Sequence, residues 1–219
     1  MGDRWGTSRL EAFSDGVFAI AATLLVLEIG VPEARIGDLW RGIGNEWPSY
    51  LAYATSFLTI GALWLGHHAI VRRLALADAT IMRINLALLM VVAFLPYPTR
   101  LVAEAIDNSE SERAAALFYG ACLLVIAVLI NVMWRYAVRN RELLEPGVSD
   151  DEARAVLRAS TPNVILYAII SVLAVFAPRA AAIGFLVIAV VAVFRARGEG
   201  PRRRAGAGSG ARPRSPGAR

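Results

Sequence analysis

The chain has 219 residues, of which 57% are hydrophobic and 19% charged, and its formal net charge is +5. Its mean hydropathy is +0.51, whereas soluble globular domains average about 45–50% apolar and about 25% charged residues, so the composition favours a membrane protein. The single cysteine excludes a disulfide framework, and two adjacent histidines supply too few ligands for a zinc cluster. We therefore expect no metal and no cofactor.

Six hydrophobic segments are close to the length of about 17–25 residues that an α-helix needs to cross a bilayer. The first stops at Gly30-Val31-Pro32, and the second starts at Pro48, a residue favoured in the first turn of a helix. The last two are short and only two residues apart, which indicates either a tight helical hairpin or a partly re-entrant pair. The predicted fold class is an all-α integral membrane protein, a six-transmembrane-helix bundle with segments at 10–29, 48–70, 84–102, 114–136, 162–177 and 180–194.

The placement of arginine predicts the orientation, because positively charged loops stay in the cytoplasm. Of the 23 arginines, eighteen lie before the first segment, after the second and fourth segments or in the C-terminal tail, and five lie in the other loops. Both termini are therefore predicted to be cytoplasmic in a multi-pass protein of the cell (plasma) membrane. We expect a membrane domain over residues 1–196. Residues 197–219 are typical of an Arg/Gly/Pro-rich disordered cytoplasmic tail attracted to lipid headgroups, and no nucleic-acid partner is expected.

Polar residues interrupt the first segment, where an ionised carboxylate costs several kcal/mol and needs a partner or a function. At about 100° per residue, Ile20, Leu24 and Leu27 fall on one apolar stripe, and Asp15 points away from it. If the stripe lines a central axis, Asp15 faces back into the helices of its own subunit.

Possible partners of Asp15 lie near the ends of the second and third segments, at a similar membrane depth. A hydrogen-bonded cluster with them would satisfy the carboxylate. For the two histidines we expect hydrogen-bonding roles in the core, with proton sensing near their unperturbed pKa of about 6.5 as the alternative. The residues of this expected cluster are Trp64, His67, His68 and Asn85.

Three stretches of the chain carry a specific pattern. Residues 9–15 read R-L-E-A-F-S-D and are followed by T-L-L at 23–25, Glu28 and Pro32; W-x-x-H-H stands at 64–68; Asn85-Leu86 leads to L-P-Y-P-T at 95–99. Over residues 9–104 this pattern resembles the transmembrane protein 175 family of potassium channels. Nothing in the sequence resembles the T-V-G-Y-G filter loop of ordinary potassium channels.

The resemblance implies a six-helix unit, present once per chain in bacteria, that assembles as a homotetramer with the first helices lining a cation pore. It places the pore constriction at Ile20 and the next turns at Leu24 and Leu27, with Thr23 as a flanking hydroxyl that can contact a passing ion. An apolar ring of this kind closes a pore by dewetting, and a narrow one favours potassium over sodium modestly. The signature residues, expected to form a structural network, are Arg9, Phe13, Ser14, Asp15, Trp64, His67, His68 and Asn85.

The predicted function is therefore a potassium-permeable channel with passive conduction and a hydrophobic gate, and residues 1–196 are its channel domain. Its expected partners are further copies of the chain, the lipid bilayer and the permeant potassium ions. One alternative is a secondary transporter, which needs inverted repeats or broken helices at matching positions; another is a proton-permeable channel. An enzyme is not expected, because two histidines and isolated serines make no catalytic constellation.

Overall fold

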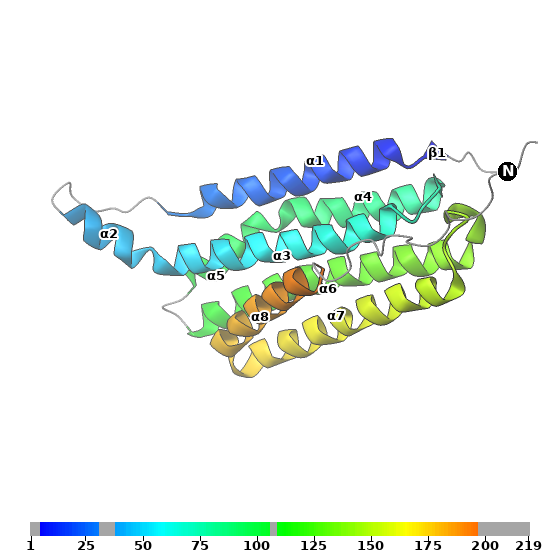
Figure 1. The fold of residues 1–219 in the computed structure, drawn as a ribbon. Coiled ribbons are helices and arrows are strands. Elements are labelled where there is room, and N and C mark those ends of the chain that lie inside the picture. Colours follow the sequence, from blue (N-terminus) through cyan, green and yellow to red (C-terminus); the bar gives the residue numbers. More distant parts are fainter. Residues whose placement is uncertain (1–4, 31–37, 106–108, 197–219) are drawn as a thin grey trace, which may run out of the picture.

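The computed structural model describes residues 5–30, 38–105 and 109–196, and most of these residues are helical (Figure 1). The predicted tail at 197–219 lies outside the described residues. The elements are β1 Trp5–Gly6, α1 Ser8–Leu24, the 3₁₀-helix η1 Leu25–Glu28, α2 Leu39–Asn45, α3 Trp47–Val71, β2 Leu76–Ala77, α4 Ala79–Phe94, α5 Pro96–Glu104, α6 Ser109–Arg139, the 3₁₀-helix η3 Arg141–Leu143, α7 Asp150–Phe176 and α8 Pro178–Ala196.

Five helical stretches are long and apolar enough to cross a membrane, and the prediction of a helical, multi-pass membrane protein is confirmed apart from one small sheet. The predicted count of six full spans is not confirmed, because the sixth apolar helix, Pro178–Phe194, is shorter than the other five. The five long stretches are Ser8–Glu28, Trp47–Val71, Ala79–Glu104, Ser109–Arg139 and Asp150–Phe176.

The fifth segment was predicted to be short, and that prediction is wrong, because the helix is longer than its hydropathy indicates. Helix α7 begins at Asp150, and Pro162, the predicted start, lies inside it. Ser149 caps the helix, since its hydroxyl accepts a hydrogen bond from the Glu152 N–H at 3.2 Å. The acidic residues in the first turn stabilise this start, because negative side chains interact favourably with the positive end of the helix dipole. Hydropathy overlooked these turns because they are polar.

The third predicted segment is broken into α4 and α5. Leu95 separates the two helices, and Pro96 begins the second, where its missing N–H leaves no intrahelical bond unmade. The Thr99 hydroxyl lies 2.9 Å from the Leu95 carbonyl and so bonds across the break. The two prolines thus interrupt the helix at Leu95, while Ala79–Glu104 still counts as one candidate membrane span.

Helix α4 also starts earlier than predicted, because Asp78 caps it. One carboxylate oxygen accepts hydrogen bonds from the Thr80 and Ile81 N–H groups at 3.1 and 2.9 Å, and the other accepts from the Tyr136 hydroxyl at 2.6 Å. Partial burial raises the pKa of Asp78, but these hydrogen bonds outweigh it, and the net pKa lies below the ordinary value. Asp78 therefore connects the start of α4 to α6.

Helix α6 lies in the middle of the bundle and contacts α4, α5, α7 and α8. Trp134 is fully buried, and its indole N–H donates to the Ala153 carbonyl at 3.1 Å. Gly120 allows a close approach, because a Cβ at this position would collide with Ser171 and press against Phe185. The largest fully buried side chains on α6 are Leu123, Ile126, Met133 and Trp134.

A small sheet that the sequence analysis did not foresee holds the start of α1. Strand β1 pairs antiparallel with β2, with Trp5 opposite Ala77. The Thr7 hydroxyl, one residue before α1, donates to the Leu74 carbonyl at 3.3 Å. The beginning of α1 is thereby fixed to the connection between α3 and α4.

Candidate functional site

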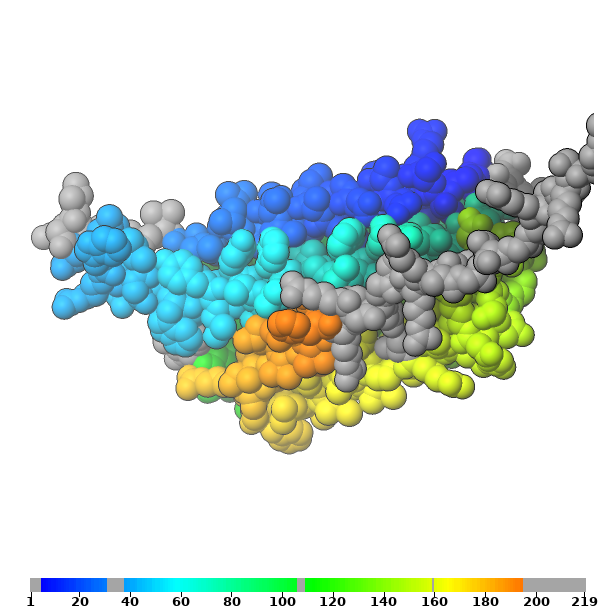
Figure 2. Space-filling view, viewed as in Figure 1, coloured from blue at the N-terminus to red at the C-terminus, as the bar shows by residue number. Residues whose placement is uncertain are grey.

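Helix α1 lies at the edge of the bundle and packs against α3 and α4 (Figure 1). In the space-filling view it runs along the upper edge of the molecule, above α3 (Figure 2). One side of the helix is fully buried, with at most 2% exposure at Ser14, Phe18, Ala21 and Leu25. The helix therefore has one side fixed by its own chain and another that is not.

The uncovered side carries the predicted apolar stripe. Ile20 is 59% exposed, Leu24 40% and Leu27 72%. Leu27 lies beyond the α-helix, in a 3₁₀ turn where side chains three residues apart eclipse one another. Leu27 is therefore aligned with Leu24, and the stripe continues to the end of the membrane segment. Thr23 is also exposed, and its hydroxyl donates to the Ile20 carbonyl at 2.9 Å.

Phe13 belongs to this exposed side, so its predicted place in a structural network stays a prediction that the contacts of one chain do not test. Its side chain is 58% exposed. On the helical wheel Phe13 lies about 20° from Ile20 and about 100° from Ser14. Ser14 faces the bundle, whereas Phe13 faces outward with Ile20.

The buried side of α1 meets a chain of hydrogen bonds through Ser14. The Asn85 amide N–H donates to Ser14 Oγ at 3.0 Å, and the Ser14 hydroxyl donates to the Leu10 carbonyl at 2.7 Å. The Asn85 carbonyl oxygen lies 2.7 Å from His67 Nε2, so this ring nitrogen donates. These hydrogen bonds all donate in the same direction, from α3 through α4 to α1. The ring of Phe18 packs against His67, with centroids 5.4 Å apart.

Two carboxylates on α1 face a second pair of side chains on α3. The Trp64 indole N–H donates to Asp15 Oδ1 at 2.8 Å, and His68 Nδ1 lies 3.3 Å from Glu11 Oε1. The Trp64 and His68 rings stack with centroids 5.4 Å apart. Glu11 and Asp15 are four residues apart on α1, and Trp64 and His68 are four apart on α3, so each helix presents its two side chains on one face. Asp15 thus faces its own subunit, away from the stripe.

Glu11, Asp15 and His68 together have the spacing of a metal site, since one ligand atom of each lies within 4.8 Å of the others. Trp64 and His68 already contact the two carboxylates, so the cluster is accounted for as a helix-to-helix contact. Arg9, the remaining signature residue, is exposed on the outer side of α1. At the other end of the segment, Glu28 Oε2 lies 4.0 Å from an Arg100 guanidinium nitrogen.

The structure therefore brings together Ser14, His67 and Asn85 in one contact set and Asp15, Trp64 and His68 in another, and it leaves Phe13 and Arg9 outside both. Glu11 was missed as the partner of His68. Its position four residues before Asp15 was the available signal, because it puts both carboxylates on one face.

Fold and site together define a mostly helical, multi-pass membrane protein whose edge helix turns its carboxylates and Ser14 inward and an apolar row outward. A sequence model of the family described as endosomal/lysosomal potassium channel TMEM175 matches residues 9–96. A potassium channel of Streptomyces collinus is 43% identical over 150 residues, which cover 68% of this chain and 73% of the relative.

Solved and vertebrate relatives agree with this match. The crystal structure of a lysosomal potassium-selective channel TMEM175 homologue from Chamaesiphon minutus superposes with a TM-score of 0.78 at 37% identity, covering 87% of this chain and 97% of that one. The endosomal/lysosomal proton channel TMEM175 of Gallus gallus is 34% identical over 148 residues, which are 63% of this chain and 30% of the relative. The chain belongs to the TMEM175 family.

Proposed function

We propose that four copies of this chain assemble around a central axis and that the exposed side of α1 lines a potassium-permeable pore with passive conduction. The relatives named above as potassium channels support potassium as the permeant ion. The observation that carries the proposal is the apolar row of Ile20, Leu24 and Leu27, which is exposed on a helix whose two carboxylates and Ser14 meet partners on the opposite side.

Conduction is limited at Ile20 in this proposal. Four branched side chains converging on an axis form an apolar neck that a hydrated ion crosses with difficulty, because the neck offers no replacement for water. Thr23, on the same side of α1, contributes the one hydroxyl close to this neck. The remaining signature contacts hold α1 against α3 and α4, so they fix the position of the neck without touching the ion.

The proposed location is the cell membrane, with both termini in the cytoplasm and six segments crossing the bilayer. The excess of arginine in alternate loops supports this orientation. Helix α8, with 19 residues, is long enough to span most of a hydrocarbon core of about 30 Å at 1.5 Å per residue.

A proton-permeable channel is the second candidate, because the vertebrate relatives of this family carry that name. The titratable groups Glu11, Asp15 and His68 lie on the opposite side of α1 from the stripe, so protons would need a path separate from the potassium path. A secondary transporter is the third. The break between α4 and α5 is the kind of discontinuity such a protein needs.

Flux measurements with purified protein in phospholipid vesicles distinguish the three candidates. We expect potassium efflux down its gradient, faster than sodium efflux and unchanged when no proton or sodium gradient is present. Efflux that requires a second ion gradient would indicate a transporter, and acidification without potassium movement would indicate a proton channel. Mass measurement in nanodiscs should give four chains per particle, and a stable monomer would refute the pore.

A further inference from the structure

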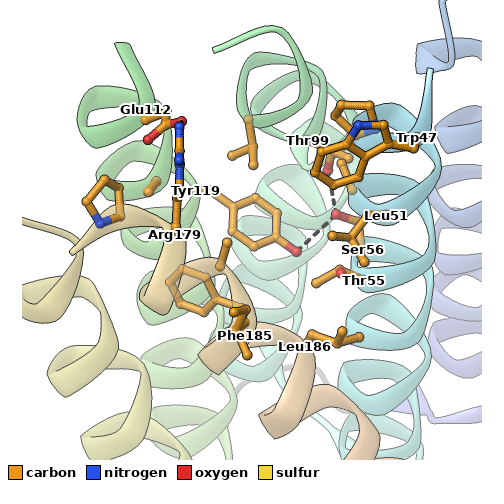
Figure 3. A pocket seen from close by; sticks show the side chains of 17 residues that line it. Trp47, Leu51, Thr55, Ser56, Thr99, Glu112, Tyr119, Arg179, Phe185 and Leu186 are labelled. Carbon is orange, nitrogen blue, oxygen red and sulfur yellow. Dashed lines mark hydrogen bonds and ion pairs between the residues drawn. The ribbon is translucent and has the colours of Figure 1, made fainter. Parts of the chain in front are cut away.

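A cavity of about 480 Å³ opens between α3, α5, α6 and α8, away from the contacts of α1 (Figure 3). This volume lies within the range of about 300–1,000 Å³ found for small-molecule sites. Three helices contribute their first turns to it, through Trp47 of α3, Glu112 of α6 and Arg179 of α8. Since these helices begin where the chain enters the apolar layer, the mouth of the cavity lies at the membrane surface and its body lies within the hydrocarbon.

The body of the cavity is mostly apolar, with a few hydroxyls in its wall. Leu51 and Ile183 are 44% and 62% exposed, so they flank an opening to the outside, whereas Phe185 is buried in the inner wall. Three of the hydroxyls that line it bond to one another. Ser56 Oγ lies 3.0 Å from the Tyr119 hydroxyl and 2.8 Å from Thr99 Oγ1 (dashed in Figure 3).

The mouth of the cavity presents a cation and an indole. The Arg179 guanidinium donates to Glu112 Oε1 from Nε at 3.0 Å and from Nη2 at 2.9 Å. The Glu112 side chain is 9% exposed and the Arg179 side chain 76%, so the pair turns its cationic member outward. Trp47, at the other side of the mouth, is 56% exposed. Tryptophan and arginine at this level are typical anchors of the membrane interface.

We propose that this cavity holds one acyl chain of a bilayer phospholipid, with the lipid phosphate beside Arg179. An apolar cavity of this size, if empty, forfeits the van der Waals contacts of its lining, and within a bilayer the acyl chain is the apolar group at the highest concentration. A phosphate complements the outward-facing guanidinium. The site involves no residue of the proposed pore, so its test is independent of ion conduction.

The test compares phospholipid retained by the detergent-purified protein and by two groups of variants. Ala182 lines the cavity, and Ala180, two residues before it on α8, is exposed and does not. Ala182→Phe and the smaller change Ala182→Leu fill the cavity, whereas Ala180→Phe adds the same ring about 3 Å nearer the start of α8, on the other face of the helix. Native mass spectrometry counts bound lipids, and the midpoint of thermal unfolding with and without added phosphatidylglycerol reports their effect on stability.

We expect one phospholipid per chain in the wild type and in Ala180→Phe, and its loss in both Ala182 variants. Added phosphatidylglycerol should raise the unfolding midpoint of the wild type but not that of Ala182→Leu. Equal retention in all variants would overturn the proposal, as would a wild type that retains only free fatty acid or no lipid. A change in the mass of the assembly in Ala182→Leu, with no lipid in the wild type, would make a second chain the occupant and would also overturn it.

Discussion

Ser14 and Ile20 lie six residues apart on α1, one fully buried and the other 59% exposed. Around Ser14, hydrogen bonds run from His67 of α3 to Asn85 of α4 and from Asn85 to Ser14 itself. Around Ile20, the row of apolar side chains has no counterpart within the described part of the chain. The inward side of α1 is therefore explained by one chain alone, and the outward side is explained only by what surrounds that chain.

This difference separates two kinds of contribution to function. The inward contacts position the helix, and their loss should change stability and assembly. The outward row contacts lipid, a neighbouring copy or the permeant ion, and in the proposed pore its alteration should change conduction without changing the fold. Variants on the two sides of α1 should thus affect different measurements.

The largest effect is expected at Ile20. Ile20→Ala widens the apolar neck, and a barrier lower by about 1.4 kcal/mol raises potassium flux about tenfold, with weaker discrimination against sodium. Potassium and sodium efflux from vesicles measure both effects. The matched control is Ile169→Ala on α7, because Ile169 is 57% exposed and belongs to no part of the proposed pore. Potassium flux that rises equally in the two variants would show that Ile20 does not limit conduction.

A smaller effect, on stability, is expected at Asp15. Asp15→Ala leaves the half-buried Trp64 indole N–H without its acceptor, at a cost of about 1–3 kcal/mol, whereas Asp15→Asn retains an oxygen that accepts. The unfolding midpoint should fall by about 2–4 °C per kcal/mol in a chain of this size. Adding Trp64→Phe to Asp15→Ala should recover part of the loss. If Asp15→Ala and Asp15→Asn are equally stable and both change ion selectivity, Asp15 is an ion site instead.

A loss of about 1 kcal/mol is expected from Asp78→Ala, which removes the cap of the helix that α1 packs against. Because the folded pKa of Asp78 lies below its unfolded value of about 3.9, its contribution is complete above that pH and is lost as the pH falls through the lowered pKa. Unfolding midpoints at pH 7 and pH 3 should show a difference between wild type and variant that narrows on acidification. A difference in unfolding midpoint that is larger at pH 3 than at pH 7 would contradict a stabilising role of the ionised Asp78.

The smallest change in stability is expected at Thr23. Its hydroxyl bonds only to the carbonyl of its own helix and is exposed, so Thr23→Val should alter the unfolding free energy by less than about 0.5 kcal/mol. On the proposed pore wall the same change removes a polar atom near the neck, and the ratio of potassium to sodium flux should fall. An unchanged ratio would exclude contact between Thr23 and the ion.

Much of the architecture was predictable from the sequence, because a membrane span needs a long apolar run and such runs are easily counted. The apolar stripe and the inward orientation of Asp15 followed from the helical period alone. The start of α7 was missed because Asp150 and its neighbours make the first turns polar. The short pairing of Trp5 with Ala77 joins residues too distant in sequence for a local pattern to predict.

The partners within the site were harder to predict than its members. Asp15, Trp64 and His68 were expected to cluster, but which side chain meets which depends on the rotation of α3 against α1, and hydropathy does not specify that rotation. Phe13 lies apart from the two contact sets because residues of one sequence motif need not occupy one face of a helix. The hydroxyls of Ser56 and Tyr119 meet between α3 and α6, and no sequence spacing indicates that contact.

The central claim is that the outward row of α1 lines a water-filled path for potassium, and thiol accessibility tests it most directly. Ile20→Cys and Ile169→Cys place matched thiols on α1 and α7, and the native Cys122 is buried, so the background reaction is small. Potassium flux through vesicles containing Ile20→Cys should be blocked by a small charged methanethiosulfonate reagent, whereas flux through Ile169→Cys should persist. Flux through Ile20→Cys that survives complete modification of its thiol would contradict the claim.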